Sequence, residues 1–261
     1  MFSSEPRCIY HKNQLGEVIC QLRFPEILSV EATIPAAFQE EIRQDFPVYS
    51  VRKEASAPKL AGTPGNFSVQ NQPLTTNYQF VSENNNWKVN LTSKFISLSC
   101  AHYTCWEDFA RKLDKPLAAF IKVYKPAYFD RIGLRYLNFI SRNQLEMNSV
   151  QYHDLIQGPF LGILSDADAD ENTALQSGVD ADVQLRGGCR VKIHSGTGMV
   201  KRNGVQDPEK KFIIDLDLYM PGRIPVNMSA GSLQTLHAQA YPLFRDAITD
   251  KLHNAMEPET L

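Results

Sequence analysis

The stretch FDRIGLRYLNFI, at residues 129–140, decides the fold of this chain. Successive side chains of a β-strand point to opposite faces, so alternation is the signal to look for. Here Ile132, Leu134 and Tyr136 share one face, and Arg131 and Arg135 share the other, on either side of a glycine. The stretch therefore predicts a strand with one apolar face that packs in the core and one face that carries arginines.

An earlier stretch, 16–24, alternates in the same way. Val18, Cys20 and Leu22 fall on one face, and Arg23 falls on the other. Further alternating or apolar runs predict seven more strands, at 48–54, 78–82, 87–91, 94–101, 181–185, 188–194 and 211–219. The segment 55–77 is rich in proline and glycine and carries one charged residue, which predicts a long flexible loop.

Two long amphipathic helices are predicted. The first begins after Thr104, which with Glu107 has the pattern of a capping box, and its apolar stripe runs from Trp106 to Tyr124. The second is predicted to be capped by Ser232, with a stripe that runs to Leu252.

The two halves of the chain follow the same plan. Each begins with an alternating strand, continues as a meander and finishes with a long amphipathic helix. This order predicts an α+β fold in which pseudo-repeated halves, 9–126 and 127–256, form one antiparallel sheet. Both long helices should then close the same face of the sheet and leave the opposite face half-exposed. The alternative is that two unrelated helices share a period by chance.

Composition predicts a single globular unit, 1–261, because 43% of the residues are hydrophobic and 21% are charged. A net charge of −2 provides no bulk basic field for a nucleic acid. The sequence contains no apolar run long enough to cross a membrane and does not begin with an apolar leader. The five cysteines are irregularly spaced, as in reduced cytosolic proteins, so we expect a cytoplasmic protein.

Five segments together resemble a family: LGEVICQLRFPEIL, IPAAFQEEIRQDFPVY, YTCWEDFARKL, FDRIGLRYLNFI and AITDKL. The chain resembles a sporadically distributed bacterial family of conserved hypothetical proteins of about this length. That family has no assigned activity, so the resemblance implies a bacterial cytosolic protein and carries no site residues with it.

The candidate functional residues lie on predicted strands. Asp215 and Asp217 alternate onto one face of a strand, and such a pair of carboxylates can hold Mg²⁺ for phosphoryl transfer. Arg23, Arg131 and Arg135 are expected on the half-exposed face of the sheet, where arginines can bind carboxylates or phosphates. The preferred interpretation is that the arginines pair with the two aspartates as a structural network.

Other candidate motifs have simpler interpretations. Cys100, His102 and Cys105 lack a fourth ligand at a recognisable spacing, so no metal site is predicted there. The acidic run 166–171 lacks the glycine and glutamate of a calcium loop and fits a solvated turn. The glycine-rich run 195–198 fits no phosphate-binding motif and is interpreted as a hairpin connection.

These observations favour a non-catalytic cytosolic binding or accessory protein, without a cofactor, that binds a protein partner or itself as a subunit of a larger bacterial assembly. The first alternative is a Mg-dependent phosphoryl-transfer or nuclease-type enzyme that uses Asp215 and Asp217. The second alternative is a nucleic-acid binder that uses the arginine-lined face of the sheet, a function that the net charge does not indicate.

Overall fold

A computed structural model describes residues 6–55, 59–63, 66–70, 74–166, 168–202 and 204–260. In this part of the chain the main element is a nine-stranded sheet in which every neighbouring pair is antiparallel. In spatial order the strands are β10 (Gly178–Gln184), β11 (Arg190–Arg202), β12 (Val205–Ile224), β9 (Phe129–Ile140), β2 (Leu15–Arg23), β8 (Phe95–Cys100), β7 (Trp87–Leu91), β6 (Leu74–Val81) and β3 (Val48–Ala55).

Two pairs of short strands lie outside this sheet: β1 (Cys8–Tyr10) with β13 (Pro258–Thr260), and β4 (Lys59–Thr63) with β5 (Asn66–Gln70). The α-helices are α1 (Leu28–Ala32), α2 (Ala36–Ile42), α3 (Trp106–Tyr124), α4 (Gly158–Leu161), α5 (Ser229–Ala247) and α6 (Asp250–Ala255). Single 3₁₀ turns are η1 (Tyr152–Asp154), η2 (Gly162–Ser165), η3 (Arg186–Gly188) and η4 (Val226–Met228).

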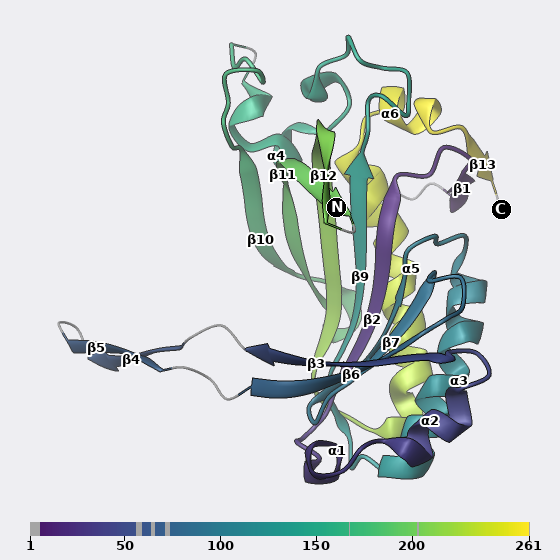
Figure 1. The fold of residues 1–261 in the computed structure, drawn as a ribbon. Helices are drawn as coiled ribbons and strands as arrows, with labels where there is room; N and C mark the ends of the chain where they lie inside the picture. Colours follow the sequence, from purple (N-terminus) through teal and green to yellow (C-terminus); the bar gives the residue numbers. More distant parts are fainter. Residues whose placement is uncertain are drawn as a thin grey trace.

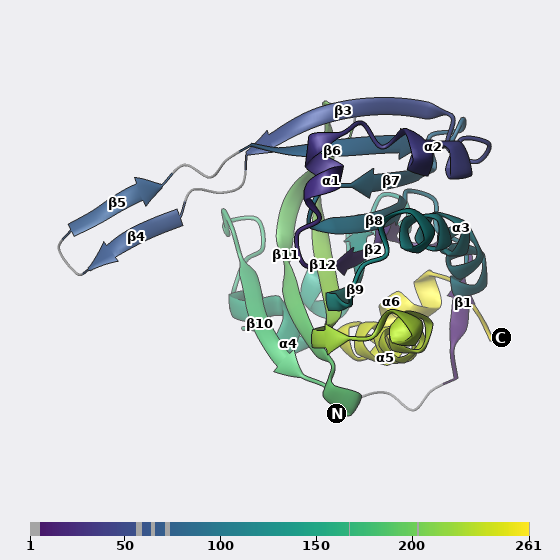
Figure 2. The same cartoon turned by 90° about the horizontal axis from the view of Figure 1, so that it is seen from below.

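The two long helices lie side by side on one face of the sheet, as Figure 2 shows. Helix α5 packs on β9 and β12, and α3 packs on β8 and α2. The core forms here because the alternating apolar residues of the central strands all turn to the helices. Cys20, Leu98, Leu134 and Leu216, from four neighbouring strands, have no exposed surface.

The sheet changes direction across its width. In Figure 1, β3 and β6 run across the direction of β9 and β12. Strands β2 and β9 are neighbours near its middle, flanked by β8 on one side and β12 on the other. The fold is therefore α+β with one large antiparallel sheet, as the sequence predicts.

The segment 55–77 differs from the predicted loop. Its described residues include β4 and β5, which pair with each other, and β6 begins at Leu74. Strand β3 pairs with β6 from Val48 to Ala55, so residues 74–77 of this segment belong to the main sheet. The sequence signal missed this pairing because proline and glycine mark the turns of a hairpin as well as a loop.

The ends of both long helices also differ from the prediction. Cys105 is the N-cap of α3, without a side-chain cap, and Thr104 instead donates a hydrogen bond of 3.2 Å to the Asp108 carboxylate. The last helix begins at Ser229 and stops at Ala247, where Ile248 becomes extended. A separate helix, α6, then begins with Thr249 as its N-cap. The predicted capping box is therefore wrong, and the predicted final helix is two helices.

The glycine-rich run 195–198 lies inside β11 and is not the connection that its composition suggests. A Cβ at Gly196 would lie 2.2 Å from the Ser177 carbonyl oxygen, so this glycine permits a close backbone approach. The acidic run forms local turns, in which the Asp166 and Asp170 carboxylates accept hydrogen bonds from backbone amides two residues further on.

None of the helices in the described part of the chain combines the length and the apolar character that a bilayer crossing requires.

Candidate functional site on the open face of the sheet

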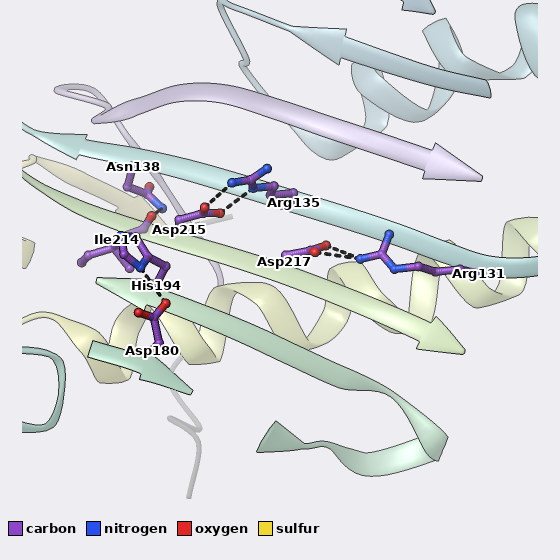
Figure 3. Close-up of polar contacts among 8 residues, drawn as sticks. All are labelled: Arg131, Arg135, Asn138, Asp180, His194, Ile214, Asp215 and Asp217. Carbon is purple, nitrogen blue, oxygen red and sulfur yellow. Dashed lines mark hydrogen bonds and ion pairs between the residues drawn. The ribbon is translucent and has the colours of Figure 1, made fainter. Parts of the chain in front are cut away.

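The face of the nine-stranded sheet that is turned away from α3 and α5 is called the open face below. Strand β9 presents Arg131 and Arg135 on it, and β12 presents Asp215 and Asp217, because the alternate residues of both strands are buried under the helices. Figure 3 shows these four side chains on the near side of the strands, with a helix behind. The structure thus brings together four of the five residues that the sequence predicts.

The pairing of charges runs diagonally between the strands. In the register of β9 and β12, Asp217 lies opposite Arg135 and Asp215 lies opposite Leu137. Nevertheless Arg135 binds Asp215, and Asp217 binds Arg131 (Figure 3). Arg135 therefore reaches along the sheet past Asp217, the carboxylate opposite it, whereas Arg131 reaches diagonally to Asp217, and the result is two separate ion pairs.

The two ion pairs have different geometry. Arg131 places Nη2 at 2.7 Å from both carboxylate oxygens of Asp217. Arg135 uses Nε, at 2.7 Å from Oδ1 of Asp215, together with a second, short contact from Nη2 to Oδ2. The second arrangement is the bidentate fork that gives a guanidinium–carboxylate pair its strength and direction. The hydrogen bond to the Asp215 carboxylate raises the pKa of Arg135 above its ordinary value.

Burial makes Asp215 the most constrained member of the set. Its side chain is 11% exposed, whereas that of Arg135 is 44% exposed. A nearly buried carboxylate is stabilised only when its charge is compensated. Arg135 therefore supplies Asp215 with the hydrogen bonds that water cannot provide there.

Gly133 creates room for the other pair. It lies on the open face between the two arginines, and a Cβ built on it would be 2.3 Å from Nη1 of Arg131. The Arg131 side chain therefore lies across this glycine, and its guanidinium stacks 4.7 Å from the centre of the Tyr219 ring. The glycine is required for close approach of a side chain to the sheet, not for a special backbone angle.

The fifth predicted residue, Arg23, is exposed on the open face at the end of β2. Its register partner on β9 is Arg131, so two guanidinium-bearing positions face each other. Among the described side chains Arg23 makes no ion pair, unlike Arg131 and Arg135. The predicted network therefore includes the aspartates and two arginines, and Arg23 lies beside it.

The arrangement leaves little capacity for metal binding. Both aspartates are occupied by arginines, and a cation would have to displace a guanidinium from each of them. The described residues contain no group of three or more His, Cys, Asp or Glu side chains placed to hold a metal ion. On this evidence the four charged residues act as a cross-strand network that holds β9 and β12 together.

Further polar pairs extend the network toward the edge of the sheet. His194 of β11 lies 2.7 Å from the Asp180 carboxylate on β10 (Figure 3), and the Tyr219 hydroxyl donates to Asp182 at 3.2 Å. Four neighbouring strands thus carry mutually compensating side chains on one face. The open face is polar, but most of these charged side chains are compensated by contacts with one another.

Sequence reasoning missed a second group of residues, on the opposite side of the sheet. Arg7, Tyr136 and His237 line a cavity of about 100 Å³ there. His237 appears in the sequence only as a residue on the last helix, and Arg7 is separated from it by 230 positions. No local pattern joins two residues so far apart, so only the fold reveals their contact.

No protein-family model matches this chain, and a search of curated proteins likewise found no match.

Proposed function

We propose that this protein is a non-catalytic binding protein that associates through the edge strand β3. The observation that carries the proposal is a set of exposed apolar side chains on a strand that has no neighbour on its outer side among the described strands. Val48, Tyr49, Val51 and Leu74 are all large, apolar and exposed, and they lie on β3 or on its partner β6.

The edge itself offers hydrogen bonds. Strand β3 stands at the end of the nine-stranded order and pairs only with β6 among the described strands. The outward-facing amides and carbonyls of such an edge can pair with an extended segment of another chain. Tyr49 and Val51, 40% and 46% exposed, would gain burial from that pairing.

The opposite edge of the sheet is less suited to docking. Strand β10 alternates Asp180 and Asp182 on its exposed side, and α4 packs against it. Charged side chains and covering elements are common ways in which proteins protect a sheet edge. Strand β3 also carries the exposed Arg52 and Lys53, but its exposed Val48, Tyr49 and Val51 distinguish it from β10.

The occupant we propose is a second copy of this chain. If two β3 strands pair antiparallel with Val51 on the twofold axis, Tyr49 lies opposite Lys53 and Ser50 lies opposite Arg52. No two like charges then face each other among these positions, and a tyrosine ring faces a lysine. The twofold axis makes one patch serve both subunits, which is the usual form of a homodimer.

Size-exclusion chromatography with light scattering tests this dimer. The wild-type chain should be a dimer at about 100 µM and dissociate on dilution toward the micromolar range. Val51→Lys should be monomeric, whereas Leu175→Lys, at a position 96% exposed and remote in sequence from β3, should remain dimeric. A monomeric wild-type chain at the highest concentration, or a dimeric Val51→Lys variant, would refute the docking edge.

The non-catalytic part of the proposal has its own test. The enzymatic and nucleic-acid alternatives draw on Asp215, Asp217, Arg131 and Arg135, which bind one another in this structure. A turnover screen over nucleotides, phosphodiesters and esters should therefore find no activity that depends on these residues. Activity that is lost in Asp215→Ala, with the fold retained, would overturn the proposal in favour of a hydrolytic function.

We also propose that the halves 9–126 and 127–256 are pseudo-repeats. Support comes from the strand order, in which the first long strand of each half, β2 or β9, lies at the centre beside the last strand of the same half, β8 or β12. A long helix, α3 or α5, follows each of those last strands. The correspondence is incomplete, because the first half adds four strands to β2 and the second adds three to β9.

A bacterial, cytoplasmic setting within a larger assembly belongs to the same proposal. It rests on the resemblance of LGEVICQLRFPEIL and FDRIGLRYLNFI to the bacterial family described above. Fractionation of the native host, followed by purification of the tagged full-length chain, tests it. Recovery in the membrane fraction would contradict the location.

A further inference from the structure

The side of the sheet that the long helices cover contains the cavity of about 100 Å³. It lies between β9, β12, α5 and the N-terminal segment before β2. Its wall is predominantly apolar and aromatic, and includes Leu15, Tyr103, Tyr136, Leu216, Ala240 and Phe244. A cavity of this size suits a molecule of about four to six non-hydrogen atoms, since a closed cavity of about 150 Å³ binds benzene and this one is partly open.

A directional chain of hydrogen bonds ends at this cavity. A guanidinium only donates, so the 2.7 Å contact between Nη1 of Arg7 and Nε2 of His237 makes that ring nitrogen an acceptor. In the neutral ring the proton then sits on Nδ1, which lies 3.0 Å from the Tyr136 hydroxyl and donates to it. Burial and the charge of Arg7 lower the pKa of His237 to about 4, which agrees with a neutral ring.

Two phenols lie at the cavity end of this chain. Since the Tyr136 oxygen accepts from His237, its own proton is available to donate, and the Tyr103 ring lies edge to face beside the Tyr136 ring. The Tyr103 hydroxyl carries a proton for which no acceptor is present among the described residues. Because Tyr103 also lines the cavity, that hydroxyl is a donor available to a ligand.

The geometry of the chain is fixed by packing. The indole of Trp106 stacks on the His237 ring, with centroids 4.6 Å apart and planes 9° from parallel. Tyr103 and Tyr136 meet edge to face at 6.1 Å. The donor is therefore held in place before any ligand arrives, which reduces the entropy lost on binding.

Charge sets the class of ligand. Arg7 is the one charged side chain in the described lining, and its Nη2 also donates to Glu107 at 2.9 Å. The guanidinium is thus already compensated, and the lining offers no second cation for a carboxylate. An uncharged ligand suits such a site better than an anion.

We propose that this cavity is a binding site for a small, uncharged, mainly apolar molecule with one carbonyl oxygen, which accepts the hydrogen bond of Tyr103. The apolar body of the ligand lies against Leu216, Ala240 and Phe244, and the oxygen points to the phenol. The site is independent of the proposed docking edge, because none of its lining residues lies on β3 or β6.

Cyclopentanone and methylenecyclopentane make a matched pair of probes, because they share a shape and differ in the acceptor. In methyl-detected NMR titrations of the full chain, cyclopentanone should shift the methyl signals of Leu216, Ala240 and Met256, and leave that of the exposed Leu175 unchanged. It should bind about three- to tenfold more tightly than methylenecyclopentane, as expected for one neutral hydrogen bond.

Tyr103→Phe isolates the donor. In this variant the two probes should bind with equal affinity, whereas Tyr49→Phe, a control at the sheet edge, should keep the preference. Ala240→Leu fills part of the cavity and should weaken both probes. The proposal is overturned if the wild-type chain does not discriminate between the probes, if cyclopentanecarboxylate binds more tightly than cyclopentanone, or if the shifted methyl groups lie elsewhere.

Discussion

His237 should make the protein lose stability as the pH falls below about 6.5. The ring is 8% exposed, accepts a hydrogen bond from Arg7 and lies against Trp106. Protonation would remove the acceptor at Nε2 and bring a second positive charge next to the guanidinium. The folded state therefore resists the proton that the unfolded chain accepts.

The size of the effect follows from the pKa values. Burial, and then the charge of Arg7, lower the pKa of His237 in the folded protein to about 4, from an ordinary value of 6.5. Above pH 6.5 the ring is neutral in both states, so its contribution is fully present. As the pH falls from 6.5 to 4, the unfolded state binds the proton first and the free energy of unfolding drops. Each pKa unit corresponds to ~1.4 kcal/mol, so the loss is about 2 kcal/mol at pH 5 and about 3 kcal/mol at pH 4.

Urea denaturation of wild type and His237→Gln, at pH 7, 6, 5 and 4, measures this loss. Carboxylates titrate in both proteins, so the difference between their free energies of unfolding isolates the histidine. That difference should change by about 2 kcal/mol in favour of the variant between pH 7 and pH 5. His102→Gln, at an exposed position, is the matched control. A pH-independent difference for His237→Gln would show that the neutral, buried ring does not contribute as argued.

Three further predictions concern stability. Arg135→Met should lower the free energy of unfolding in urea by about 3 kcal/mol, because it leaves the nearly buried Asp215 carboxylate without its compensating charge. Asp215→Asn should lower it by about 1 kcal/mol, since water can reach the remaining guanidinium. Equal losses in the two variants would contradict this asymmetry. Gly133→Ala should lower the free energy of unfolding by about 1 kcal/mol, because the added methyl group displaces the Arg131 guanidinium. The loss should be smaller when Gly133→Ala is combined with Arg131→Met. If the losses of the two substitutions simply add, displacement of Arg131 is not the cause. Thr249→Ala should lower the free energy of unfolding by about 1 kcal/mol in the same assay, and Thr249→Ser should lower it much less, because the hydroxyl caps α6. Similar losses in the two variants would mean that the cap is unimportant.

Alternation along the strands predicted much of the candidate site. The period-two pattern at 129–140 matches β9 at both ends, and it places Arg131 and Arg135 on the open face. The same argument puts Asp215 and Asp217 on one face of β12. The specific pairing could not be predicted from the sequence, because it depends on the inter-strand register and on the extension of Arg135 past Asp217, the carboxylate opposite it, to Asp215.

Tertiary contacts explain where the sequence signal failed. The apolar stripe of the last helix continues through Ile248 to Leu252, yet the helix stops at Ala247. There the Ala247 carbonyl accepts from the Gln157 amide, and the Thr249 amide donates to the Leu155 carbonyl. Backbone partners from a segment about 90 residues earlier thus replace intrahelical bonds, and no local propensity encodes that exchange.

The central strand β9 connects the two sites without making them one. Arg135 and Tyr136 are consecutive residues, so alternation directs the first into the ion-pair network and the second into the hydrogen-bond chain that runs from Arg7 through His237. Because β9 is hydrogen-bonded to β2 on one side and to β12 on the other, its backbone is held on both edges, and both side chains project from a rigid support. The proposed docking edge β3 is separated from β9 by four strands. Association at that edge and ligand binding in the cavity therefore use different surfaces, and substitutions at Val51 and Tyr103 should separate the two activities.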